Sequence, residues 1–175
     1  MAIEPDPITA TYLARNIAAN DVQSLCDIAQ TAVGKEEGTI SFTVGKDTVN
    51  QVQNDVKEPS QVVPLTRLDS LVADTMPALM KMDVEGYELE ALEGSEKILS
   101  SSQLMAIIIE NTDPKVVAIL ADHGFSRYSY DPVSRCVAQG ITGLKSNNGI
   151  FVRDAAALTE RLQGSSRRVY RGQIV

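Results

Sequence analysis

Apolar and polar residues follow two different spacings along this 175-residue chain, and each spacing predicts a kind of element. Residues 8–19 repeat apolar residues at helical spacing, which predicts an amphipathic helix with a buried face. The apolar residues expected on that face are Ile8, Tyr12, Leu13 and Ile17. Pro7 suits the first helical position and Asp6 suits the cap before it. Residues 104–109 are continuously apolar, as in a strand buried on both faces.

The stretch from Ala78 to Glu90 changes from strand to helix within a few residues. Its apolar start predicts a buried strand, and the acids Asp83 and Glu85 follow before Gly86. An open α/β sheet presents side chains to a ligand at this place, beyond the carboxyl end of a strand. Because the two acids lie two apart in a segment expected to be extended, both can point to the same side. A simple cap that complements the helix dipole remains an equal alternative.

After Gly86 the pattern predicts one helix that runs to about Ser100. The leucines expected on its buried face are Leu89, Leu92 and Leu99. Gly94 inside this helix weakens it. Close packing against a neighbouring element would explain the glycine, and a tolerated cost is the alternative.

Strands alternating with helices predict βαβ units, and therefore an α/β fold with a mainly parallel, doubly wound sheet. The later strand candidates predict an antiparallel addition at the C-terminal edge of that sheet; they are residues 125–130, 135–138 and 149–152. The length predicts one domain over residues 1–154. Residues 155–175 are then expected to form a C-terminal helical tail.

Composition narrows the classes of partner. The formal net charge of −7 argues against nucleic-acid binding. The longest apolar run is too short to cross a membrane, and no secretory signal is visible, so we expect a cytoplasmic protein. Cys26 and Cys136 are then most simply free thiols. Because His123 is the one histidine and no CxxC occurs, no zinc site is expected.

Several segments together resemble a known family. They are IEPDPITATYLARNIAAND, TAVGKEEGTISF, PLTRLDSL, MKMDVEGYELEALEGSEKIL, IIIEN and NNGIFV. In this order they resemble the FkbM-type, S-adenosylmethionine-dependent methyltransferases over about residues 2–152. The resemblance implies a Rossmann-like class I methyltransferase fold and methylation of a hydroxyl oxygen on a sugar or natural product. It implies S-adenosylmethionine as the cofactor and a small-molecule hydroxyl acceptor as the partner.

The resemblance also implies roles for individual residues. Glu4 matches the acid after the second strand of such folds, which accepts hydrogen bonds from the ribose hydroxyls of the cofactor. Ala32 and Val33 match the loop that borders the adenine. Asp83 and Glu85 match the central acidic motif, near the methionine end of the cofactor and the acceptor. They are the candidate catalytic residues, for proton removal or acceptor orientation, and Asp83 is a candidate cofactor contact as well.

The sequence departs from the family pattern in one respect. It contains no GxG segment, and its first residues match the family's second strand, so the first strand and the glycine-rich loop are expected to be missing. We therefore expect this chain to bind S-adenosylmethionine weakly or not at all. Glu110, at the end of the strand predicted over residues 104–109, is either an ordinary strand-end acid or a further group in the same cleft.

Three functions compete at this point. The first is an O-methyltransferase, and the second is a methyltransferase-like binding module that has lost cofactor affinity and catalysis. The third is a nucleotide-cofactor oxidoreductase, because an acid after a second strand also suits a nicotinamide ribose. A metal-binding role for Asp83 or Glu85 is the weaker alternative, and a homodimer is left open.

Overall fold

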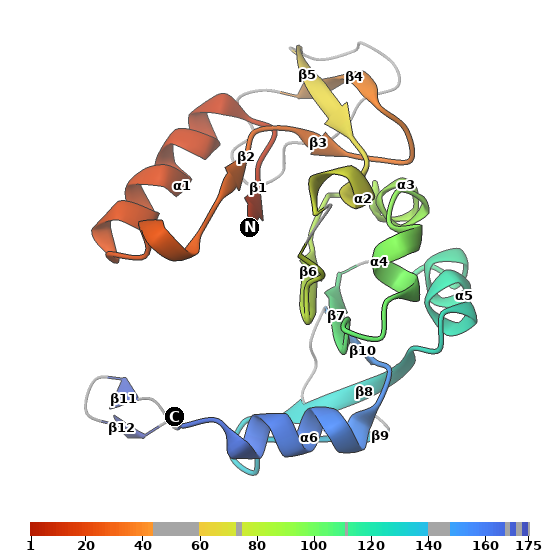
Figure 1. The fold of residues 1–175 in the computed structure, drawn as a ribbon. Coiled ribbons are helices and arrows are strands. Elements are labelled where there is room, and N and C mark those ends of the chain that lie inside the picture. The colour runs from red at the N-terminus through yellow and green to blue at the C-terminus, as the bar shows by residue number, and fades with distance from the viewer. Residues whose placement is uncertain are drawn as a thin grey trace. The chain divides into compact units, whose positions relative to one another are not determined.

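The computed structural model describes residues 1–43, 60–72, 75–110, 112–139 and 148–166, and the backbone alone at 169–170 and 173–174 (Figure 1). The sequence alternates apolar and polar residues at Ile40, Phe42 and Val44, which predicts a half-buried strand, and Val44 lies outside the described ranges. The chain divides into two compact units. The first unit comprises residues 1–75 and 84–98, and the second comprises residues 76–83 and 99–175.

The first unit contains two small sheets and short helices (Figure 1). A parallel pair joins β1 (Ala2–Ile3) to β2 (Ile28–Ala29). In the second sheet, β5 (Ser60–Thr66) lies between β3 (Ala32–Val33), which is parallel to it, and β4 (Gly38–Thr43), which is antiparallel. The helical segments are α1 (Pro7–Ala19), η1 (Gln23–Leu25), α2 (Leu68–Leu71), α3 (Glu88–Glu93) and α4 (Glu96–Ser100), the last of which ends across the unit boundary.

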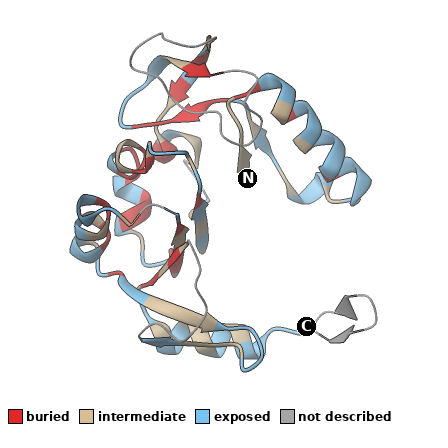
Figure 2. Ribbon diagram, turned by 180° about the vertical axis from the view of Figure 1, so that it is seen from behind, coloured by how far each residue is buried: buried red, intermediate tan, exposed pale blue. Residues whose placement is uncertain are grey.

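Helix α1 begins as predicted, because the Asp6 side chain accepts the backbone N–H groups of Ile8 and Thr9 at its N-terminus. Its predicted buried face is only partly correct. Ile17 is buried, but Tyr12 is 57% exposed and Ile8 is 66% exposed. Figure 2 shows α1 as largely exposed. Helical spacing decides which side chains share a face, whereas burial needs another element to cover that face.

The single helix predicted to run to Ser100 is instead two helices. Helix α3 ends at Gly94, and α4 begins at Glu96. The break is stabilised by Asp69 from α2. The backbone N–H of Asp69 donates to the Gly94 carbonyl at 3.1 Å, and its carboxylate accepts the N–H groups of Lys97 and Ile98. These contacts use the backbone groups that a continuous helix would pair internally.

The core of the first unit lies in the β3–β5–β4 sheet and under α3. Its apolar cluster comprises Ala32, Phe42, Val63 and Leu65, with Ile40 and Tyr87 packed against it. The predicted inward positions on α3 and α4 are confirmed for Leu92 and Leu99, which are fully buried, and Leu89 is half-buried.

The second unit contains one five-stranded sheet in the order β6–β7–β10–β8–β9. Its strands are β6 (Leu79–Met82), β7 (Ala106–Ile109), β8 (Ser126–Asp131), β9 (Cys136–Gln139) and β10 (Gly149–Val152). The β6–β7 pair is parallel, and the other pairs are antiparallel, in agreement with the antiparallel C-terminal addition expected from the sequence. Helices α5 (Pro114–Asp122) and α6 (Ala155–Gly164) and the short pair β11 (Val169–Tyr170) and β12 (Gln173–Ile174) complete this unit.

The prediction of an α/β fold is confirmed, but the described strands do not form one mainly parallel sheet. Parallel pairing among them is confined to β1–β2, β3–β5 and β6–β7. Strands join into one sheet through a continuous hydrogen-bonded ladder. Here β1, β2 and β3 have two residues each, and β6 is an edge strand that pairs with β7 alone among the described strands.

Arg153 holds together several chain segments of the second unit. Its guanidinium donates to three carbonyl oxygens. They belong to Leu99 near the end of α4, to Leu104 just before β7 and to His123 just after α5. The same guanidinium stacks over the ring of Phe125, with 4.3 Å between its Cζ and the ring centroid. The two cysteines are free thiols, as predicted. No helix in the described parts of the chain has the length and hydropathy needed to cross a bilayer.

Candidate active site

The acidic segment after β6 forms a tight turn, which we call the acidic turn (Val84 to Tyr87). The N–H of Tyr87 donates to the carbonyl oxygen of Val84 at 3.2 Å. Both central residues have positive φ, 47° at Glu85 and 88° at Gly86, as in a type I′ turn. Gly86 adopts this conformation readily, whereas a residue with a Cβ pays about 1–2 kcal/mol. The extended conformation assumed for Glu85 from the sequence is therefore wrong.

Asp83 follows β6 in the second unit and carries a charge partner. Its carboxylate lies 2.7 Å from the Lys81 ammonium, and its side chain is 44% exposed. The hydrogen bond from Lys81 is the main reason that the pKa of Asp83 is lowered; burial opposes this shift, and the charge of Lys81 and a hydrogen bond with Glu110 add to it. This carboxyl is therefore ionised at neutral pH.

Glu110 lies at the same edge of the second unit's sheet as Asp83. Strands β6 and β7 are parallel with Met82 opposite Ile109, so the next residue of each strand projects beyond the same edge. This register brings the two carboxyl groups close to each other. The expectation that Glu110 ends its strand at the edge that carries Asp83 is confirmed.

Glu4 follows β1 in the first unit and is half-buried. Its Oε1 accepts the backbone N–H of Asp6 at 2.8 Å, and its other oxygen accepts no hydrogen bond from the described residues. Burial raises the pKa of Glu4; the Asp6 N–H partly offsets this shift, and the Asp6 charge adds to it. Asp6 is fixed in turn, because its Oδ2 accepts the side-chain amide of Gln61 on β5 at 3.0 Å.

Ala32 and Val33 form β3 and are both buried. They pair in parallel with Leu65 and Thr66 of β5. The Ala32 side chain belongs to the apolar cluster, and Gly34 follows at the end of the strand. These two residues therefore lie on a strand fixed by its ladder and by its packing.

Tyr87 brings the acidic turn and β3 together inside the first unit. Its ring packs against the cluster that contains Ala32. A Cβ placed on Gly34 would lie 3.2 Å from Tyr87 Cε1 and 2.9 Å from Leu65 Cδ1, so the ring and Gly34 are in close contact. Sequence reasoning missed Tyr87, because one aromatic residue after a glycine gives no signal of long-range packing.

Glu88 is a second residue that the sequence did not single out. It is 2% exposed, and its Oε1 accepts the N–H of Gly86 at 3.3 Å. A buried carboxylate is costly unless it accepts hydrogen bonds. Its burial at the start of α3 therefore marks the acidic turn as a part of the fold that is held in place and not a loose connection.

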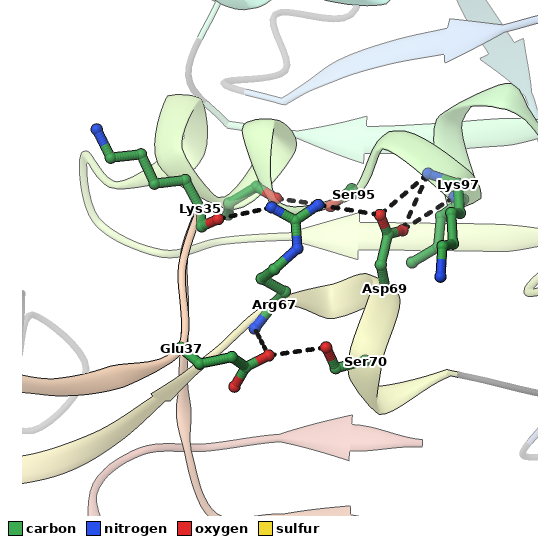
Figure 3. Close-up of polar contacts among 9 residues, drawn as sticks. Lys35, Glu37, Arg67, Asp69, Ser70, Ser95 and Lys97 are labelled. Carbon is green, nitrogen blue, oxygen red and sulfur yellow. Dashed lines mark hydrogen bonds and ion pairs between the residues drawn. The ribbon is translucent and has the colours of Figure 1, made fainter.

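Arg67 and Asp69 tie the loop after β3 to the helices (Figure 3). The Arg67 guanidinium donates to the Lys35 carbonyl at 2.7 Å and pairs with Asp69 at 3.3 Å. The Arg67 backbone N–H and the Ser70 hydroxyl both donate to one oxygen of Glu37. In Figure 3 the Asp69 carboxylate points to the start of α4, where it caps that helix.

The first unit thus contains Glu4, β3 and the acidic turn from Val84 onward, and the second unit contains Asp83 and Glu110. The convergence of Glu4, Asp83 and Glu85 on one cleft stays a prediction. The fold and the positions of these acids after strands define the chain as an α/β protein.

Comparison with known proteins identifies the family within that class. The family model for the methyltransferase FkbM domain matches residues 1–127, so the chain belongs to the FkbM methyltransferase domain family. The resemblance inferred from the sequence is confirmed. This placement argues against the oxidoreductase alternative.

Two individual proteins are similar to this chain. "Methyltransferase sdnD" from Sordaria araneosa is 26% identical, and the match covers 71% of this chain and 63% of that protein. The crystal structure of "Methyltransferase FkbM" from Methylobacillus flagellatus KT matches with a TM-score of 0.52 at 19% identity. That match covers 86% of this chain and 35% of the solved chain, and it supports the fold alone. The chain thus spans less than two thirds of each protein.

Proposed function

We propose that this chain forms part of an S-adenosylmethionine-dependent O-methyltransferase with a Rossmann-like fold. We propose a hydroxyl group of a sugar or natural product as the acceptor. The observation that carries the proposal is the family match over residues 1–127, a range that includes Glu4, β3 and the acidic turn. The acceptor class is the one that the sequence resemblance implies.

The residues present fit the adenosine half of the cofactor. The Glu4 carboxylate has one oxygen that accepts no hydrogen bond from the described residues, so it is able to accept one from a ribose hydroxyl. Ala32 and Val33 are small and apolar but buried in the packed sheet, so the end of β3, and not these two side chains, is left to border the flat ring. Because the pKa of Glu4 is raised above 4.5, affinity for the adenosine half should be full at neutral pH and should fall as pH is lowered through that raised value.

Asp83 and Glu85 are the candidates for assisting methyl transfer. When bound, S-adenosylmethionine supplies a methyl group on a sulfonium, which is a good leaving group. The protein must then align an acceptor hydroxyl and help to remove its proton. Asp83 suits acceptor orientation, because its lowered pKa makes it a hydrogen-bond acceptor and a poor base. Glu85 remains the candidate base.

The test is methyl transfer from methyl-labelled S-adenosylmethionine to a panel of hydroxylated sugars and natural products. We expect labelled product with the native chain and a fall of about 10²-fold or more for Glu85→Gln, since a general base contributes about that much. Glu160→Gln on α6 is the matched control and should keep the native rate. Absence of product with every acceptor would contradict the proposed methyl transfer. Equal rates for the native chain and Glu85→Gln would contradict the proposed role of Glu85 as the base.

A methyltransferase-like binding module without catalysis is the second candidate function. Such a module would bind an acceptor from the same panel without producing labelled product. A cytoplasmic location and a homodimer are further parts of the proposal that family membership leaves open. Sedimentation of the purified chain decides between monomer and dimer.

A further inference from the structure

We propose that Tyr87 is a positioning residue, which seats the acidic turn against the end of β3 and so sets the spacing between the two parts of the cofactor site. This inference rests on the proposed function, because it takes β3 as the adenine side and the turn as the side near the methionine end. The structural part, that Tyr87 holds the turn, can be tested without any ligand.

The first observation is the packing of the Tyr87 ring. The ring packs against the apolar cluster of the β3–β5–β4 sheet, and a Cβ on Gly34 would approach Tyr87 Cε1 to 3.2 Å. A ring in this place leaves too little room for a Cβ at position 34, since an overlap of a few tenths of an ångström is felt in a packed interior. Glycine at position 34 is therefore what lets the ring lie against the strand end.

The second observation is that Gly34 is itself fixed on its other sides. Its N–H donates to the Thr66 carbonyl at 3.1 Å. Its carbonyl oxygen lies so close to α3 that a Cβ on Gly94 would be 2.0 Å from it. Tyr87 thus packs on a backbone segment that the β5 ladder and the end of α3 hold in place.

The third observation concerns the hydroxyl end of the ring. Burial raises the pKa of Tyr87, and the charges of Glu90 on α3 and Glu36 in the loop after β3 raise it further. The phenol is therefore neutral at physiological pH and lies near two carboxylates. Because the ring makes the contact with Gly34, Tyr87→Phe should retain the positioning, whereas Tyr87→Leu should lose it.

Loss of the ring should release the turn and leave β3 unchanged. Strand β3 keeps its ladder, Ala32 opposite Leu65 and Val33 opposite Thr66, whatever stands at position 87. The turn keeps the hydrogen bonds from Tyr87 N–H to Val84 and from Gly86 N–H to Glu88, but it loses the packing of the ring against the sheet. Glu85, held at a φ of 47°, is then free to leave that strained conformation.

The direct experiment is backbone ¹⁵N relaxation of the native chain, Tyr87→Leu and the matched control Tyr87→Phe. We expect order parameters of about 0.85 at Glu85 and Gly86 in the native chain and in Tyr87→Phe, and below ~0.6 in Tyr87→Leu. Ile107 in β7 should be equally rigid in all three proteins. Gly34→Ala, which crowds the ring without removing it, should also loosen the turn and serves if Tyr87→Leu does not fold. A turn that stays rigid in both would overturn the proposal.

The ligand experiment adds a result that a merely structural role would not give. In NMR titrations, Tyr87→Leu should bind S-adenosylmethionine at least about tenfold more weakly, equivalent to ~1.4 kcal/mol, while its affinity for adenosine stays within about twofold. Equal losses for both ligands would overturn the proposed link to site spacing. A native chain that binds neither ligand would contradict the proposed function, and the order parameters alone would then decide whether Tyr87 holds the turn.

Discussion

An apolar buried face was expected on both α1 and α3, but α1 buries only Ala10 and Ile17 and is otherwise more exposed than α3. On α1, Ile8 and Tyr12 are mostly exposed, whereas Leu92 on α3 is fully buried. Helix α1 is the longer of the two and has the better cap, with Asp6 and Pro7 at its start. Cap and length therefore do not decide which helix belongs to the core.

The difference lies in contacts from distant parts of the sequence. Helix α3 ends where the Gly94 carbonyl accepts the Asp69 N–H, and Gly94 lies against the backbone of Gly34. Asp69 also caps α4 and pairs with Arg67. A helix is held in the core of this unit by such contacts, and its own periodicity supplies only the apolar face.

The largest expected effect separates the two helices directly. Leu92→Ala should lower the free energy of unfolding by about 2–5 kcal/mol, because it removes a fully buried side chain and leaves a cavity. Tyr12→Ala on α1 is the comparison variant and should change it by less than ~0.5 kcal/mol. Urea denaturation of both variants measures this, and equal losses would show that the α1 face is buried in solution.

The next effect tests the close approach between α3 and the loop after β3. Gly94→Ala should destabilise by about 1–3 kcal/mol, because its Cβ would lie 2.0 Å from the Gly34 carbonyl oxygen, a backbone atom with little room to move. Gly164→Ala at the end of α6 meets nothing within 4 Å and should be neutral or slightly stabilising. Thermal unfolding of the pair compares them. A neutral Gly94→Ala would contradict the close packing.

A smaller effect concerns the cap that separates α3 from α4. Asp69→Ala removes the acceptor for the Lys97 and Ile98 N–H groups and should cost about 0.5–2 kcal/mol. Asp122→Ala, on the exposed side of α5, should leave stability within ~0.5 kcal/mol. The urea midpoints of the two variants measure this difference. Equal midpoints would show that other groups cap α4.

The smallest effect has the opposite sign. Glu85→Gly should stabilise the chain by about 0.5–1 kcal/mol, because relief of the positive φ outweighs the greater freedom of glycine in the unfolded chain. Glu160→Gly inside α6 should destabilise by a similar amount. Calorimetric melting of both variants supplies the comparison, and a destabilised Glu85→Gly would show that the Glu85 side chain contributes to the fold.

Local features of the fold could be predicted from the sequence. The start of α1 depends on Asp6 and Pro7, which are its immediate neighbours, and the strand at residues 106–109 depends on an unbroken apolar run. The exposure of Tyr12 and the helix break at Gly94 could not be predicted, because they depend on residues far away in the sequence. From the sequence, Gly94 was compatible with close packing against a neighbouring element or with a tolerated cost to the helix. Its close approach to Gly34 decides for close packing.

The candidate site divides in the same way. The sequence placed Glu4, Asp83 and Glu85 beside strand ends, because strands and acids are adjacent in the chain. It could not predict the left-handed conformation of Glu85, since turn type depends on how the flanking segments are held. Nor could it predict that Tyr87 packs against Gly34, a contact between residues more than fifty positions apart.

The measurement that tests the account most directly is a titration of S-adenosylmethionine into the ¹⁵N-labelled chain, up to several times ~1 mM. We predict weak binding, with a dissociation constant of about 1 mM or above, and chemical-shift changes at Glu4, at Ala32 and Val33, and at Gly86 and Tyr87. Glu4→Gln should weaken the binding further. Shift changes confined to β8 and β9, or micromolar affinity that Glu4→Gln leaves unchanged, would contradict the proposed site.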